Sequence, residues 1–113
     1  MIRDRLNISL YKGESFSMLV KLEEEDGTAI SLTGATITAQ CRVKATNVVL
    51  FSFTTAVVSP SSDGKFTISL PAGSTSNITP QKGLVYDVKI VWAGGDTKYW
   101  LGGDVLIYDT VTS

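Results

Sequence analysis

The chain has 113 residues, of which 43% are hydrophobic, and its ten basic and eleven acidic residues give a net charge of −1. This length fits one domain with one core, taken here to span residues 1–113, and the balanced charge argues against the basic face that nucleic-acid binding requires. The sequence contains no histidine and a single cysteine, Cys41. An intrachain disulfide and any histidine-based catalytic or metal site are therefore excluded.

The first predicted elements are a short strand in residues 7–11, a turn at Gly13 and a longer strand in residues 15–22. In "ESFSMLVKL" every second residue is apolar, which is the period of a strand with one buried face. The acidic run Glu23–Asp26 is followed by Gly27, and an Asp-Gly pair is typical of tight hairpin turns. We interpret this run as a solvated hairpin tip rather than a cation site.

Three further strands are expected in the middle of the chain. The first follows a turn at Gly34 and places Cys41 in phase with inward-facing apolar residues, so the thiol is predicted to be buried. Residues 44–47 then link it, as a hairpin, to the apolar strand "VVLFSFTT". A third strand is expected after a turn at residues 59–64. Its inward-facing side chains should be Phe66, Ile68 and Leu70.

A short helical turn is the expectation for residues 71–83, because Pro71 suits a first helical position and Gly83 a stop. Residues 84–107 predict a long hairpin that turns at Gly94-Gly95, with Trp92 on the inward phase. Gly102-Gly103 lie inside the return strand, where glycine marks a bulge or a close backbone approach. The phases of Tyr99 and Trp100 are opposite, so one of the two rings should be exposed.

The predicted fold is all-β: an antiparallel two-layer β-sandwich of immunoglobulin-like architecture, with seven to eight strands and one short helical turn. A small barrel would show the same spacing of strands and turns. True antibody domains have two cysteines and a tryptophan at a characteristic spacing, and this sequence lacks that pattern. The likeness to immunoglobulins is therefore one of architecture.

No constellation of catalytic or cofactor-binding residues is evident. Asp87, Asp104 and Asp109 are the candidate carboxylates for acid–base chemistry, and nothing in the sequence places any two of them in a shared cleft. No phosphate-binding glycine loop occurs, and the aspartates lack the spacing of a calcium loop. We expect a non-enzyme without cofactor or metal, soluble and with no membrane-spanning run.

Several turn and strand motifs follow one another in a recognisable order: "YKGES", "SLTGATITAQCR", "DGKFTISLPA", "YDVKI" and "YWLGGDVLI", with a terminal "VT". This succession, over residues 8–112, resembles the small β-sandwich structural proteins of tailed bacteriophages. The resemblance implies a component of the tail, baseplate, fibre attachment or capsid surface. The acidic "LEEEDG" and the lack of a long appended domain depart from a receptor-binding fibre and favour an accessory or decoration protein.

The resemblance thus implies a virion protein, made in the host cytoplasm, that contacts other capsid or tail proteins and associates with itself, with no nucleic acid and no membrane as partner. Chain ends with unpaired strand edges are natural places for neighbours to add on. We expect partner contacts in segments 2–11 and 104–112 and at one aromatic residue between them. The candidate contact residues are Ile2, Leu6, Tyr11, Trp100, Tyr108 and Val111. The alternative is a carbohydrate-binding sandwich that binds a surface glycan through Trp100 and Tyr99.

Overall fold

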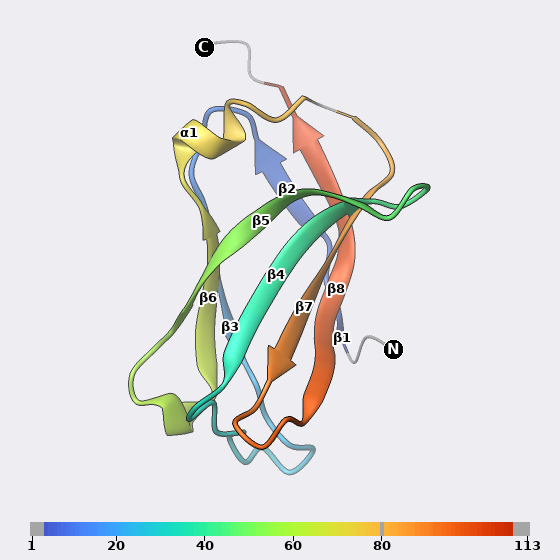
Figure 1. Cartoon of the computed structure of the whole chain (residues 1–113). Coiled ribbons are helices and arrows are strands. Elements are labelled where there is room, and N and C mark those ends of the chain that lie inside the picture. Colours follow the sequence, from blue (N-terminus) through green and yellow to red (C-terminus); the bar gives the residue numbers. More distant parts are fainter. Residues whose placement is uncertain (1–3, 80, 110–113) are drawn as a thin grey trace.

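The computed structural model describes residues 4–79 and 81–109, and within these ranges the protein is all-β (Figure 1). The predicted class is confirmed, and so is the predicted number of strands. Two short helical segments complete the fold: the 3₁₀ turn η1 (Ser61–Asp63) and α1 (Ala72–Thr75). The eight strands are β1 (Asp4–Arg5), β2 (Ile8–Tyr11), β3 (Phe16–Lys21), β4 (Thr36–Val43), β5 (Val48–Val57), β6 (Lys65–Leu70), β7 (Leu84–Val91) and β8 (Thr97–Tyr108).

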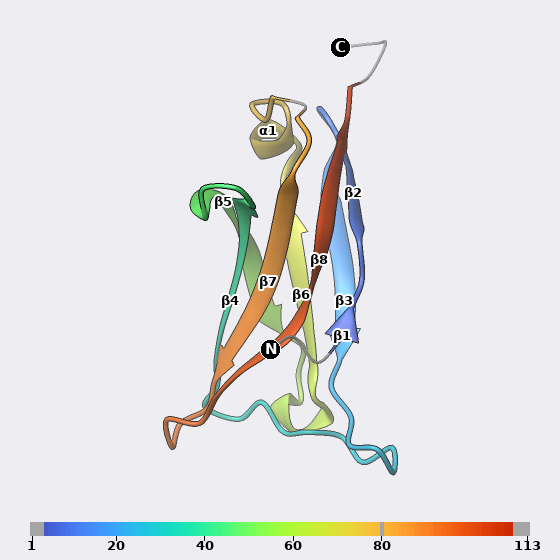
Figure 2. The same cartoon turned by 90° about the vertical axis from the view of Figure 1, so that its right-hand side faces the viewer.

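All eight strands belong to one hydrogen-bonded sheet of order β1-β8-β7-β4-β5-β6-β3, with β2 also paired to β8. The long strand β5 connects the two halves, because residues 48–53 pair with β4 and residues 54–57 pair with β6. Figure 2 shows β4 at one side of the view and β3 at the other, with β7, β6 and β8 between them. The sheet therefore curls into a nearly barrel-shaped body rather than dividing into two clearly separate layers.

The purely antiparallel arrangement predicted from the sequence is wrong at the N-terminal strands. Both β1 and β2 run parallel to β8, with Ile8 opposite Val105 and Tyr11 opposite Tyr108. Ile8 and Leu10 on β2 are almost fully covered by the core. Removing such side chains from water stabilises by roughly 1.5–3 kcal/mol each, enough to hold this segment on the open edge of β8.

The alternation expected for the central strands is confirmed by their burial. Tyr86, Val88 and Ile90 on β7 are buried, while the residues between them are partly exposed. Cys41 is fully buried on β4, as its phase predicts. Trp92 follows the same phase and is only partly buried, because it lies past the end of β7 at the edge of the core.

The turns lie where glycine and proline place them. Gly27 and Gly95 have φ values of 90° and 91°, the left-handed region that favours glycine. The acidic tip is confirmed as a local hairpin turn, because Glu23 and Ala29 form an antiparallel bridge across it. It lies within the connection between β3 and β4, which do not pair with each other. Helix α1 confirms the predicted helical turn, and its buried Thr75 hydroxyl accepts a hydrogen bond from the backbone N–H of Gly13 at 3.2 Å.

Candidate interaction surface

The N-terminal segment is fixed to the sheet by a group of contacts around Leu6. The hydroxyl of Tyr86 donates to the Leu6 carbonyl oxygen, and the Leu6 N–H donates to the carbonyl oxygen of Gly102 at 2.9 Å. Asn7 accepts a hydrogen bond from the backbone N–H of Asp104 at 3.0 Å. These bonds position strands β1 and β2 along β8, and with them the side chains that both strands carry outward.

Gly103 permits this contact because it has no side chain. A Cβ at this position would collide with the carbonyl oxygen of Leu6 and lie 2.8 Å from its carbonyl carbon. The close backbone approach predicted for Gly102-Gly103 is therefore confirmed. The bulge lies earlier, where the register places Leu101 opposite Val88 and Tyr99 opposite Lys89, which leaves Trp100 as the extra residue.

Two of the predicted contact residues, Tyr11 and Tyr108, come together on the outer face of the β2–β8 pair. They are register partners, and their rings stack with centroids 5.3 Å apart and an interplanar angle of 22°. Leu106, one outward position before Tyr108, is 47% exposed, and the two tyrosines are 48% and 45% exposed. We call Tyr11, Leu106 and Tyr108 the tyrosine patch. Sequence reasoning missed Leu106, although it shares the phase of Tyr108.

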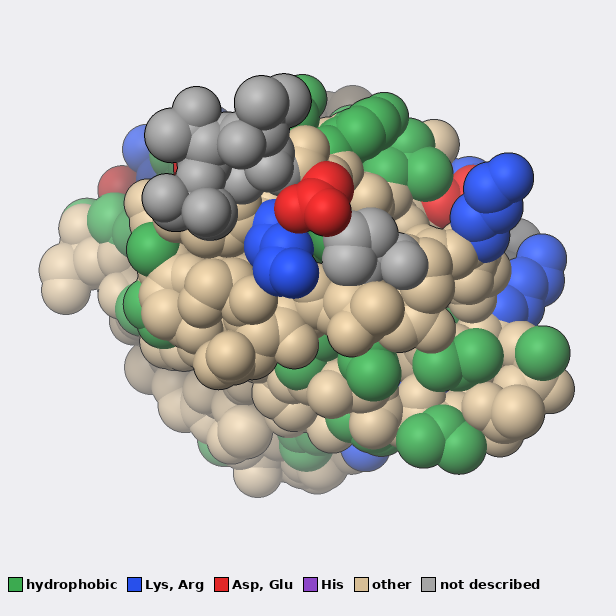
Figure 3. All heavy atoms as spheres, turned by 90° about the horizontal axis from the view of Figure 1, so that it is seen from above, with side chains coloured by type: hydrophobic (Ala, Val, Ile, Leu, Met, Phe, Trp, Pro, Cys, Tyr) green, Lys and Arg blue, Asp and Glu red, His purple; other side chains and the backbone are tan. Residues whose placement is uncertain are grey.

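A groove of about 650 Å³ adjoins the tyrosine patch. Leu84, Leu106 and Tyr108 contribute apolar lining, and Lys44 and Lys82 contribute charge from the β4–β5 hairpin and the segment before β7. Neither lysine has an ion-pair partner within residues 4–79 and 81–109. Figure 3 looks down on this end of the molecule, where blue basic side chains project beside green hydrophobic ones. We call this feature the lysine groove; the sequence did not predict it.

The other predicted contact residues lie elsewhere. Leu6 is half exposed and, together with Leu19, lines a smaller groove of about 320 Å³ between β1 and the edge of β3 that no described strand pairs with. Trp100 is partly buried and lies near the beginning of β8, away from Tyr108 at the end of that strand. Ile2 and Val111 fall outside the described residues. The structure thus brings together two of the four predicted residues that it describes.

Trp100 lines a cleft of about 390 Å³ with Trp92, at the end of the molecule opposite the lysine groove. The indole N–H of Trp92 donates to the carbonyl oxygen of Ser31 at 2.8 Å, which fixes that ring. Tyr99 is 42% exposed. The expectation that one of Tyr99 and Trp100 is exposed is confirmed for Tyr99, since the bulge turns Trp100 toward the cleft.

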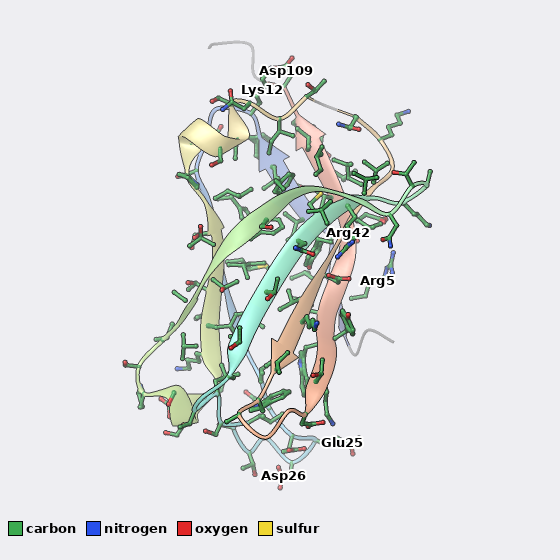
Figure 4. The ribbon with its side chains drawn as sticks, in the orientation of Figure 1. Arg5, Lys12, Glu25, Asp26, Arg42 and Asp109 are labelled. Atoms are coloured by element: carbon green, nitrogen blue, oxygen red, sulfur yellow. The ribbon has the colours of Figure 1, made fainter. Side chains whose placement is uncertain are left out.

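The acidic run lies at the same end as this cleft. Figure 4 shows Glu25 and Asp26 at the bottom of the molecule, whereas Lys12 and Asp109 lie at the top. Hydrogen bonds from Thr28 to the Asp26 carboxylate lower the pKa of that carboxyl, so it is ionised at neutral pH. No group of three His, Cys, Asp or Glu residues in the described ranges could hold a metal ion.

The three aspartates considered for catalysis do not form a site. Asp87 is partly buried on the outer face of β7, and Asp104 lies 3.5 Å from Arg5 in an exposed ion pair. Asp109 follows β8 at the top of the molecule, as Figure 4 shows. Burial raises the pKa of the Cys41 thiol to about 12, which leaves it protonated and unreactive at neutral pH.

Comparison with known proteins adds no relative: no protein-family model matches the chain, and no curated protein matches it in sequence. Among the residues that the structure describes, no helix has the length and apolar character needed to span a bilayer.

Proposed function

We propose that this protein is a non-enzymatic structural component of a tailed-bacteriophage virion, a small accessory or decoration protein of the capsid or tail that acts through protein–protein contacts. The tyrosine patch carries the proposal. It presents two stacked tyrosines and a leucine, all about half exposed, on the β2–β8 pair. The other edge of β2 pairs with no strand among the described residues. Tyrosine is enriched at protein interfaces, and free strand edges accept strands from neighbouring chains.

We further propose that the architecture is immunoglobulin-like. In that fold the second and fifth strands are neighbours in one layer, and the third, sixth and seventh are neighbours in the other. The pairs β3–β6, β4–β7 and β7–β8 reproduce these neighbours when β1 and β2 together are counted as the first strand. Strand β5 then corresponds to the variable connection between the third and fifth strands. Such sandwiches serve many unrelated functions, so this architecture supports a binding or structural role without specifying the partner.

Replacement of the patch tests the role in assembly. We expect a variant with Leu106→Ser and Tyr108→Ser to melt within a few degrees of the wild type, because both side chains are about half exposed and lie outside the core, and to be lost from purified virions. The matched control is Val58→Ser, an exposed apolar residue just after β5 and away from the patch. Incorporation is measured by quantitative mass spectrometry of gradient-purified particles. Wild-type levels of the patch variant in virions would refute the proposed contact surface.

The cleft of Trp92 and Trp100 supports a second candidate function, binding of a surface glycan. Two indole rings beside Glu24, Asp96 and Lys98 combine apolar faces with charged hydrogen-bonding groups, a mixture suited to sugar rings and their hydroxyls. Tyr99, which the sequence grouped with Trp100, does not line this cleft. A glycan array separates the two functions: reproducible binding that Trp100→Ala abolishes would favour the carbohydrate module, and absence of binding would leave the structural role.

A further inference from the structure

We infer that copies of this chain associate head to tail, with the acidic loop of one copy, Glu23–Asp26, entering the lysine groove of the next. The inference rests on the assembly role proposed above and specifies a surface and a partner for it. Three features carry it: an exposed anionic loop, an unpaired cationic groove with an apolar lining, and their placement at opposite ends of the molecule.

The acidic loop is exposed and already shaped for contact. Within it, only Glu23 forms an ion pair, with Lys21 at 3.1 Å, so the other three carboxylates have no cationic partner in the described residues. The backbone is held by bonds from Glu24 N–H to the Thr28 carbonyl oxygen at 2.7 Å and from Gly27 N–H to the Glu24 carbonyl oxygen at 2.9 Å. An ordered turn loses little conformational freedom when it binds.

The lysine groove offers complementary chemistry. Lys44 and Lys82 are exposed ammonium groups. Among the described residues that line the groove, the one carboxylate is that of Asp104, which is already paired with Arg5. The apolar lining of the groove includes Leu84 and, from the tyrosine patch, Leu106. A glutamate has both an anionic head and an apolar stem, so an acidic loop can pair with the lysines while its methylene groups cover the apolar lining.

The two surfaces lie at opposite ends of a body that measures 43 × 29 × 23 Å. Figure 4 places Glu25 and Asp26 at the bottom, and the lysine groove lies at the upper end, where β7 begins and β8 finishes in Figure 1. Contact between two different patches is heterologous, so each added copy leaves one loop and one groove free. Such contacts generate rings when the rotation closes and filaments when it does not, both of which suit a repeating virion structure.

Sedimentation velocity on purified protein, at low and high salt, measures this association. We expect the wild type to form concentration-dependent oligomers that weaken at high salt. The groove variant Lys44→Glu/Lys82→Glu and the loop variant Glu24→Lys/Glu25→Lys should each associate at least about tenfold more weakly alone, because like charges then face each other. Mixing the two variants restores opposite charges at every contact, so the mixture should associate again.

The control variant Lys65→Glu/Lys89→Glu makes the same change in net charge outside the groove and should associate as the wild type does. A wild type that stays monomeric at all concentrations, or a groove variant that associates normally, would overturn the inference. So would a mixture that fails to associate while each variant melts like the wild type. The outcome is separable from the proposed function, because the presence of the wild-type chain in virions is scored independently of its self-association.

Discussion

Substitution of Gly103 by alanine tests how the N-terminal segment is attached to the sheet. A methyl group at this position would meet the Leu6 carbonyl group, both of whose atoms are backbone and cannot rotate away. The same carbonyl accepts the hydrogen bond from Tyr86. We therefore expect Gly103→Ala to push residues 5–8 off β8 or to strain the strand pair, and to destabilise the fold in either case.

The expected magnitude follows from the cost of forcing one methyl group into a filled space, about 1–3 kcal/mol. With an unfolding entropy of about 2.1 cal/mol/K per residue, a chain of 113 residues loses about 4 °C of Tm for each kcal/mol. Gly103→Ala should thus lower Tm by about 4–13 °C. Gly94→Ala is the matched control: no atom lies within 4 Å of the added Cβ, so the change should stay within about 0.5 kcal/mol.

Differential scanning calorimetry gives the two Tm values, and hydrogen exchange reports the strand itself. In the alanine variant the amides of residues 8–11 should exchange faster than in the wild type, while those of β4 and β7 remain protected. Equal Tm values for the variants at positions 103 and 94, with unchanged exchange in residues 8–11, would show that the N-terminal segment does not lie against Gly103 as described.

Three further predictions concern the core and the cleft. Cys41, fully buried, should react slowly with maleimide in the native state, and Cys41→Ser should cost about 1–3 kcal/mol; rapid native labelling would contradict its position. Burial raises the pKa of Cys41 from 9.0 and that of Tyr86 from 10.0 to about 12, so the folded state keeps protons that the unfolded state loses. Stability should be fully present below about pH 9 and fall as the pH rises toward 12, and in Cys41→Ala the fall should begin nearer pH 10. Urea titrations at each pH measure this, and if the thiol were exposed the wild type and Cys41→Ala would show the same pH profile. Trp92→Phe removes the donor to Ser31 and should cost about 1 kcal/mol beyond any packing loss, whereas Asp96→Asn should stay within about 0.5 kcal/mol; equal losses in chemical denaturation would show that the indole bond contributes nothing.

The features that could be predicted from the sequence are those fixed by neighbouring residues. Alternating polar and apolar side chains identify the buried face of β7, and the phase of Cys41 on β4 follows from the same rule. Turns at Gly27 and Gly95 follow from the freedom of glycine to adopt positive φ. Tyr11 and Tyr108 were selected because they lie near chain ends, and the structure pairs them directly.

The remaining features depend on residues far apart in the chain. Nothing local indicates that β2 runs parallel to β8, because no tight turn joins them and a parallel pairing leaves no turn motif. The lysine groove likewise combines Lys44, residues 81–85 and residues 104–108, which meet only when the sheet curls. The bulge at Trp100 shifts the phase of the strand by one residue, so alternation alone could not place both Tyr99 and Leu101.

Cryo-electron microscopy of purified virions tests the proposed structural role most directly. We expect density for this eight-stranded sheet at symmetry-related positions on the capsid or tail, with the tyrosine patch of Tyr11, Leu106 and Tyr108 against a neighbouring subunit. Virions that contain no copy of the chain, or copies whose tyrosine patch faces solvent on every side, would contradict it.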